Sequence, residues 1–198
     1  MELAKAEQFI LDKLQMELPE YLYYHSFSHT QDVLAAALRI ASDEGVKKED
    51  TMLLRTAVLY HDAGFTIQNK DHEEIGCDIA QKTLPNFDYT ANEIRIICGM
   101  IMATKIPQSP HNLLEEIICD ADLDYLGRED FEVISNNLRL EFLEFGIVLN
   151  NLEWEVKQIS FLESHNYFTA TSRRTRNTPK TKQILKLKKE FEDHKIIP

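Results

Sequence analysis

Apolar residues recur every three or four positions along almost the whole chain, and this spacing restricts the fold more than any other feature of the sequence. Six glycines and six prolines in 198 residues leave few interruptions, and the period-two alternation of strands is hard to find. We therefore predict an all-α fold, a single-domain bundle of about seven to eight helices. The apolar stripes lie near residues 3–14, 33–41, 54–61, 75–84, 94–102, 114–121 and 131–159, and a short helix is expected after Pro179.

The stripe from Phe131 to Ile159 is the most regular of these. It predicts one long helix or two nearly collinear helices, with Gly146 as the break. Such a stripe could pack within the chain or pair with a second copy, so a homodimer stays open as an alternative.

Composition and charge exclude several classes of protein. The net charge of −11 argues against a chain that binds extended nucleic acid along its whole surface. No run of ~18 apolar residues predicts a membrane span, and the first 20 residues, in which acids and bases alternate, do not resemble a secretory signal. The three cysteines form no CxxC pair and are expected to be reduced core thiols of a cytoplasmic protein.

Positive charge gathers near the C-terminus. Eight basic residues and no acid lie between Arg173 and Lys189. This segment could be a solvated terminal helix, or a flap that brings positive charge to an anionic ligand.

His61 and Asp62 break the rule that apolar side chains fill the helix faces toward the core. They follow Ala57 and Val58 by four residues, which places both beside the face expected to be buried. A buried carboxylate next to an imidazole is costly unless another group compensates for it. A metal cation does so, because it keeps the carboxylate ionised and the imidazole neutral.

The same conflict recurs at two further positions. Asp122 follows Ile118 by four residues on an apolar stripe, whereas Asp120 and Asp124 are expected to lie outside. His29 stands one turn before the apolar stripe of its own helix. Each residue alone has an ordinary explanation, such as a core histidine or a capping acid. Together, two histidines and two aspartates that point inward from three helices favour a metal site.

In this order, on helices, the four residues resemble the signature of the HD superfamily of metal-dependent phosphohydrolases: a His, a His-Asp pair and a distant Asp. The resemblance covers about residues 20–130, which would be the core of an HD-type bundle, with residues 131–198 as a helical C-terminal extension. It implies that His29, His61, Asp62 and Asp122 bind one divalent metal.

A finer resemblance concerns His25. The Tyr24-His25 pair, four residues before His29, is similar to a stretch of cyclic-nucleotide phosphodiesterases in which this His is the general acid for the leaving oxygen. Ser26 stands where those enzymes have Asn, and the interval from the His-Asp pair to the distant Asp is much shorter here. The resemblance implies an acid role for His25, and a loop or first-turn histidine is the plain alternative.

The segment that starts at His72 resembles the place where dinuclear HD proteins supply a further metal ligand. Those proteins have additional histidines on the next helix, whereas residues 100–105 contain none. We therefore expect His72 to contact a bridging water or a substrate phosphate. Glu73 is a candidate base or water-positioning group, and the alternative for Glu73 and Glu74 is that first-turn acids complement the helix dipole.

The imidazole nitrogens and carboxylate oxygens of His29, His61, Asp62 and Asp122 form a mixed donor set. Such a set suits Mn²⁺, Fe²⁺, Co²⁺, Ni²⁺ or Zn²⁺ better than Ca²⁺, with Mg²⁺ as an alternative. Asp62 would adjoin the attacking water and could accept its proton. The candidate catalytic residues are therefore Asp62 and the two residues introduced above, His25 and Glu73. Phosphates require further cations. The candidate substrate-binding residues are His72, Lys105, Arg128, Arg173 and Arg174.

The function expected from these residues is hydrolysis of a nucleotide or another small phosphorylated metabolite, in which a metal-activated water attacks phosphorus. The nearest competing function is that of a phosphodiesterase of the cyclic-nucleotide type. A non-catalytic sensor that binds metal or nucleotide would also keep these residues, and so would a protein whose metal is purely structural.

Overall fold

The computed structural model describes residues 1–196, and their side chains as far as residue 193. The described residues contain nine α-helices, three short 3-10 helices and no strand, which confirms the all-α prediction. The helices are α1 (Leu3–Glu17), α2 (Phe27–Asp43), α3 (Lys48–Tyr60), α4 (His72–Thr83), α5 (Ala91–Ala103), α6 (Leu113–Asp122), α7 (Phe131–Glu144), α8 (Asn151–Ser164) and α9 (Ala170–Ile196), with the 3-10 helices η1 (Ala63–Thr66), η2 (Leu84–Phe87) and η3 (Asp124–Gly127). The helix count exceeds the expected seven to eight because the stripe from Phe131 to Ile159 forms two helices, the second of the two alternatives predicted for it.

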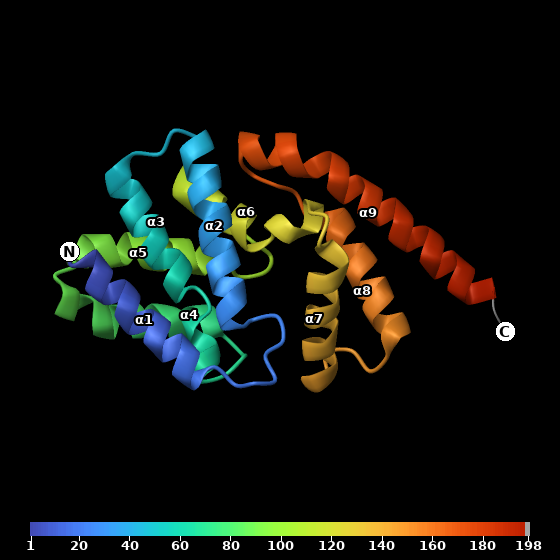
Figure 1. Ribbon diagram of the computed structural model, residues 1–198, viewed down its shortest axis with the longest axis horizontal. Helices are drawn as coiled ribbons and strands as arrows, with labels where there is room; N and C mark the ends of the chain where they lie inside the picture. The colour runs from blue at the N-terminus through green and yellow to red at the C-terminus, as the bar shows by residue number, and fades with distance from the viewer. Residues whose placement is uncertain (197–198) are drawn as a thin grey trace.

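Helices α1 to α6 surround one hydrophobic core (Figure 1). Each contributes the stripe that its sequence spacing predicts, and Ile10, Ile40, Leu54, Ile97 and Ile118 are all fully buried in it. Because α2 packs against both α3 and α6, residues near the ends of these three helices come together.

A second core joins the C-terminal helices to this bundle. Phe131 of α7, Leu162 of α8 and Tyr167 of the following loop pack with Tyr24 and with residues of η3. Tyr24 directly precedes the first candidate site residue, so this second core lies next to the predicted site.

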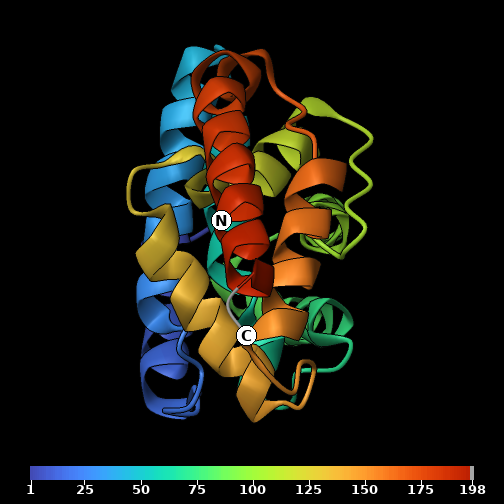
Figure 2. The ribbon, with the colours of Figure 1, turned by 90° about the vertical axis from the view of Figure 1, so that its right-hand side faces the viewer.

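Helices α7 and α8 form an antiparallel hairpin rather than one collinear rod (Figures 1 and 2). Gly146 adopts a φ of +66° in the turn, a backbone conformation that glycine reaches at no steric cost. Asn150 then caps α8 by accepting the backbone N–H of Glu153 at 3.0 Å. The rings of Phe142 and Trp154 pack edge to face across the hairpin. Leu149, Leu152 and Val156 are exposed, so only part of the apolar stripe packs within the chain.

Helix α9 starts well before Pro179, which corrects the expectation of a short helix after that proline. Its first turn is held by Thr169, whose hydroxyl accepts the N–H of Ser172, and by Glu44, which accepts the N–H of Thr171 at 2.6 Å. A proline removes one backbone donor from a helix interior, but α9 packs along α8 and η3 and continues past it.

Asp120 and Asp124 are buried, contrary to the expectation that they lie outside. Asp120 accepts the backbone N–H groups of Phe168 and Thr169, both at 2.8 Å. Asp124 accepts hydrogen bonds from Arg39 at 2.8 Å and from Arg176 at 2.7 Å. Asp120 thus binds the segment that leads into α9, and Asp124 binds α2 and α9 themselves. Spacing within the local sequence cannot reveal such distant partners.

The structure bears on the expectations for membrane spans and for the cysteines. None of the helices among the described residues has the length and apolar content needed to cross a bilayer. The three cysteines are unpaired, with Cys77 and Cys119 buried and Cys98 half-buried.

His165, between α8 and α9, makes the stability of the C-terminal region depend on pH. Burial and the nearby charge of Lys180 lower the pKa of His165 to about 4, because both oppose a positive charge on the ring. The unfolded chain therefore takes up this proton at a higher pH than the folded protein. The contribution of His165 to stability is fully present above about pH 6.5 and is lost as the pH falls toward 4.

Between pH 7 and pH 5, we expect the free energy of unfolding to fall by about 2 kcal/mol more in wild type than in His165→Gln, because only wild type has the ring that titrates. The measurement is urea unfolding of both proteins at the two pH values, with His111→Gln as the control, because His111 is exposed. An equal pH dependence in wild type and His165→Gln would contradict this assignment.

Candidate metal centre

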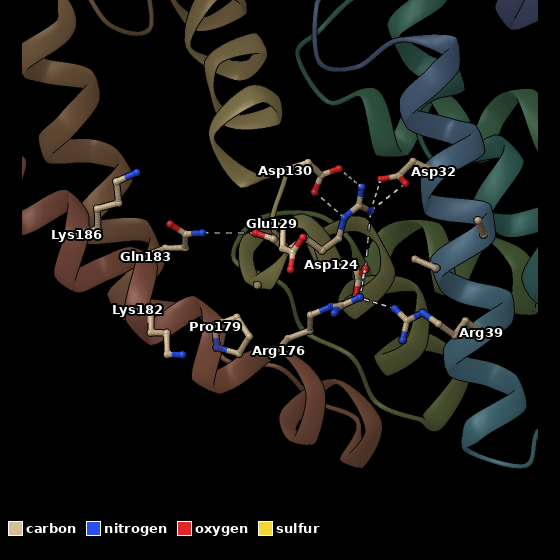
Figure 3. Close-up of a pocket in the computed structure, with 14 residues that line it drawn as sticks. Asp32, Arg39, Asp124, Glu129, Asp130, Arg176, Pro179, Lys182, Gln183 and Lys186 are labelled. Carbon is tan, nitrogen blue, oxygen red and sulfur yellow. Dashed lines mark hydrogen bonds and ion pairs between the residues drawn. The ribbon is translucent and has the colours of Figure 1, made fainter.

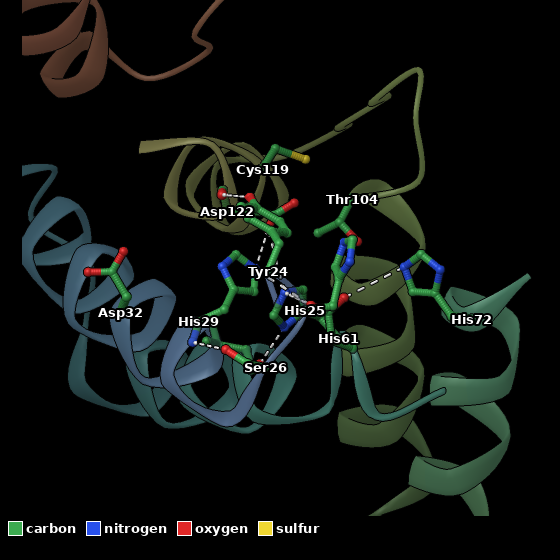
Figure 4. A network of polar contacts seen from close by, with 12 residues as sticks. Tyr24, His25, Ser26, His29, Asp32, His61, His72, Thr104, Cys119 and Asp122 are labelled. Atoms are coloured by element: carbon green, nitrogen blue, oxygen red, sulfur yellow. Dashed lines mark hydrogen bonds and ion pairs between the residues drawn. The ribbon is translucent and has the colours of Figure 1, made fainter. Parts of the chain in front are cut away.

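Three side chains from separate helices meet at one point (Figure 4). The donor atoms of His29, His61 and Asp122 all lie within 4.8 Å of one another. The Oδ2 atom of Asp62 lies 3.2 Å from the Nε2 atom of His61 and 3.5 Å from that of His29. The structure thus brings together all four residues for which the sequence predicts metal binding.

Local structure explains how each residue reaches this point. Ser26 caps α2 by accepting the N–H of His29, which sets His29 in the first turn. His61 is the C-cap of α3, and Asp122 is the last residue of α6. A Cβ at Gly64 would lie 2.0 Å from the backbone oxygen of His72, so only glycine lets the chain after the His-Asp pair pass so close to α4.

The donor set fits a divalent metal. The Nδ1 atom of His61 lies 2.7 Å from the carbonyl of Val58, so Nδ1–H donates there and the lone pair of Nε2 faces the cluster. This Nε2 and the Oδ2 of Asp62 are buried without a hydrogen-bond partner among the described residues. Buried polar atoms are nearly always satisfied, and a bound cation would satisfy both.

The electrostatics of the cluster also favour a cation. Burial raises the pKa of the Asp62 carboxyl, but the adjacent His61 ring outweighs it and holds that pKa well below its usual range. Burial lowers the pKa of His61, and the charge of Asp62 raises it well above its ordinary value. The carboxylates of Asp62 and Asp122 on either side of this ring make the cluster a place where positive charge is stabilised.

His72 and Glu73 lie at the edge of the cluster, in the first turn of α4. The Nε2 atom of His72 is 3.6 Å from Oδ1 of Asp62 and 3.4 Å from Oε1 of Glu73. The side chain of Glu73 is buried. Both residues are therefore close enough to contact a molecule bound at the centre.

His25 is held by a glutamate that sequence reasoning missed. Its Nδ1 contacts Oε1 of Glu141, whose Oε2 accepts the N–H groups of Tyr24 at 3.0 Å and His25 at 3.1 Å. Glu141 is fully buried on α7. The available signal was its position three residues after Leu138, which places a charge on an apolar stripe.

Two consequences follow for His25. Burial lowers its pKa, but the bond to Glu141 and the charges of Asp62 and Asp122 raise it above the ordinary value. Its ring also stacks on Phe65, with centroids 4.2 Å apart. The ring of His25 is thus fixed beside the cluster, in surroundings that favour its protonated form.

We expect Glu141→Gln to lower turnover by about 10- to 100-fold while the metal stays bound, because His25 loses the carboxylate that orients and charges it. Glu144→Gln on the exposed face of the same helix is the matched control. The measurements are turnover and metal content, with a thermal melt to show that both variants fold. Unchanged turnover in Glu141→Gln would exclude the positioning role.

Three of the basic residues predicted to bind substrate have other neighbours. Lys105 pairs with Asp71 at 3.2 Å, and Arg173 donates to the carbonyl of Tyr167 at 2.9 Å. Arg174 is exposed in the second turn of α9 and interacts electrostatically with Glu44. Within the described part of the chain, none of the three contacts the cluster.

Arg128, the fourth of these residues, faces a separate cavity between α2 and α9 (Figure 3). It donates to Asp32 at 2.7 Å and to Asp130 at 2.5 Å. Arg176 and Asp124 pair beside it. The structure thus places Arg128 in an ion-pair network that ties α9 to the bundle, away from the metal cluster.

Comparisons with known proteins agree with this geometry. A family model described as "HD domain" matches residues 26–124, half of the chain. The crystal structure of a predicted HD superfamily hydrolase from an uncultured Thermotogales bacterium has a similar fold, with a TM-score of 0.61 and 21% sequence identity. The likeness covers 94% of this chain and 91% of that one. No curated protein matches significantly.

The matched range contains His29, His61, Asp62 and Asp122, the four residues that converge in the structure. The likeness to the crystal structure extends the shared fold beyond that range into the C-terminal helices. The chain belongs to the HD-domain family.

Proposed function

We propose that this protein is a metal-dependent phosphohydrolase that acts on a small phosphorylated metabolite, nucleotides included. The observation that carries the proposal is the pair of buried, unpartnered donor atoms, Nε2 of His61 and Oδ2 of Asp62, beside a histidine held in position to donate a proton. A structural metal would need no such donor.

Each residue of the centre has its own role in the proposed reaction. A divalent cation held by His29, His61, Asp62 and Asp122 supplies a water of lowered pKa and neutralises phosphate charge. The carboxylate of Asp62 accepts the proton of the attacking water. His25, fixed at Nδ1, presents its Nε2–H to the leaving oxygen.

His72 and Glu73 complete the proposal at the edge of the centre. The distance of 3.6 Å between His72 and Asp62 puts His72 within reach of a phosphate oxygen bound beside that carboxylate. Glu73 lies 3.4 Å from His72 and orients its ring. The ligand set suits Mn²⁺, Fe²⁺, Co²⁺, Ni²⁺ or Zn²⁺, with Mg²⁺ as an alternative.

The test is a substrate panel with protein loaded separately with each of these ions. Inorganic phosphate is measured from monoesters, the monoester product is measured by chromatography from cyclic and linear diesters, and phosphate, pyrophosphate and tripolyphosphate are measured from nucleoside triphosphates. Turnover of monoesters supports the proposal. Turnover of cyclic diesters alone would identify a phosphodiesterase, and saturable nucleotide binding without turnover would identify a sensor.

A chelator separates a catalytic metal from a structural one. We expect EDTA to abolish turnover while far-UV circular dichroism retains most of the helical signal, because the core of α1 to α6 is apolar and continuous. Cooperative unfolding on chelation would indicate a structural metal.

A further inference from the structure

A cavity of about 290 Å³ adjoins the metal centre on the side of the C-terminal hairpin. Tyr24, His25 and Asp122 form its wall toward the centre, and α7 and α8 supply much of the rest. It is distinct from the cavity of Figure 3, which lies between α2 and α9. A molecule whose phosphate binds at the centre would therefore have room for its remaining part on the side where His25 lies.

The walls of this cavity are apolar and rich in aromatic rings. Tyr125, Phe131, Phe142, Trp154 and Phe161 all line it. Flat rings pack well against such walls, because aromatic pairs are favourable in offset and edge-to-face arrangements.

Few polar groups of the cavity are free to bind a ligand. The hydroxyl of Tyr24 already donates to the carbonyl of Asp122, and the amide of Gln158 donates to Ser135. Lys157 is exposed and has no carboxylate partner among the described residues. A ligand with many hydroxyl groups would lose its bonds to water here without replacing them.

The volume limits the size of the group that fits. A protein cavity of about 150 Å³ with apolar walls accepts benzene. The present cavity is nearly twice as large, so it has room for one substituted ring or two fused rings.

We propose that this cavity binds the leaving group of the substrate, and that the substrate is a phosphate monoester of an alcohol with an aromatic ring next to the phosphorylated carbon. The inference rests on the proposed hydrolase function. Water forms the new bond to phosphorus, the ester P–O bond breaks, Asp62 takes the proton of the water and His25 gives a proton to the leaving alkoxide. The products are inorganic phosphate and the aromatic alcohol.

The first experiment compares 4-nitrobenzyl phosphate with glycerol 3-phosphate, since both release a primary alcohol. We expect kcat/KM of the metal-loaded protein to be about 100-fold higher for the aromatic ester, the order expected from burial of one ring. Leu138→Asn puts an amide into the cavity wall, and we expect it to lower this ratio about tenfold. Leu140→Asn is the matched control, since Leu140 has similar burial on the same helix but does not line the cavity; its ratio should stay at the wild-type value.

A second readout does not depend on turnover. Trp154 is the single tryptophan of the chain and lines the cavity, so 4-nitrobenzyl alcohol should quench its fluorescence saturably. We expect about tenfold weaker binding in Leu138→Asn and wild-type binding in Leu140→Asn.

The two readouts separate the possible failures. Hydrolysis of both esters at similar kcat/KM, or a preference that Leu138→Asn leaves unchanged, would overturn the cavity assignment and leave the hydrolase function standing. No hydrolysis of any phosphate ester would refute the proposed function, and with it the leaving-group role. Absence of saturable quenching would by itself overturn ring binding in the cavity.

Discussion

Asp62→Ala is expected to remove the bound metal and to lower kcat/KM by at least about 1000-fold, because the activated water and the neutralising charge are lost with the metal. The Oδ2 atom of Asp62 lies 3.2 Å from Nε2 of His61 and has no hydrogen-bond partner of its own among the described residues. We therefore expect its main contribution to this site to be the binding of a cation. Elemental analysis of purified wild type and variant, each supplied with Mn²⁺ or Fe²⁺, measures the metal per chain.

Asp78→Ala is the matched control, because Asp78 is exposed on α4 and lies outside the cluster. It should keep the metal content and turnover of wild type. Asp62→Ala protein with full metal content and full activity would show that Asp62 has no part in the site. One metal per wild-type chain fits the four residues of the cluster, and two would make His72 a ligand as well.

His25→Ala is expected to lower turnover by about 100- to 10,000-fold while the metal stays bound. His25 bonds to Glu141 through Nδ1 and stacks on Phe65, so these contacts hold its ring apart from the cluster. We expect its removal to take away the proton for the leaving oxygen and to leave the candidate metal-binding residues in place. Turnover and elemental analysis of the same preparations test the two halves of this expectation.

The leaving group provides a sharper test of the acid role. A 4-nitrophenolate ion leaves without a proton, so the loss caused by His25→Ala should be much smaller with 4-nitrophenyl phosphate than with an alkyl phosphate. His111→Ala, which alters an exposed histidine, is the control. Loss of metal in His25→Ala would make His25 a ligand, and equal losses with both esters would exclude an acid role.

The class of fold and the inward position of the candidate metal-binding residues could be predicted from the sequence because both depend on local spacing. A residue three or four positions from a buried one shares its helix face. This rule alone placed His61 and Asp62 beside the core and Asp122 on the stripe of its helix, where the structure has them. The resemblance to the HD superfamily then grouped them into one site, which the observed distances support.

The same rule was wrong where a distant segment supplies the partner. Asp120 and Asp124 were expected to be exposed, but residues about 50 positions further along the chain bind both of them. Spacing also could not show that the chain turns back at Gly146, because one residue with positive φ is enough to convert a rod into a hairpin.

The sequence by itself determined the all-α class, the apolar faces that α1 to α6 bury, and the polar residues His61, Asp62 and Asp122 on or beside those faces. Only the tertiary structure decided that Glu141 of α7 holds His25 across 116 positions of the chain, and that the hairpin of α7 and α8 forms an apolar cavity beside the metal centre. The physical reason is the range of the forces. Helix formation and the choice of face depend on neighbours within about one turn, whereas contacts between helices depend on how whole apolar faces pack together.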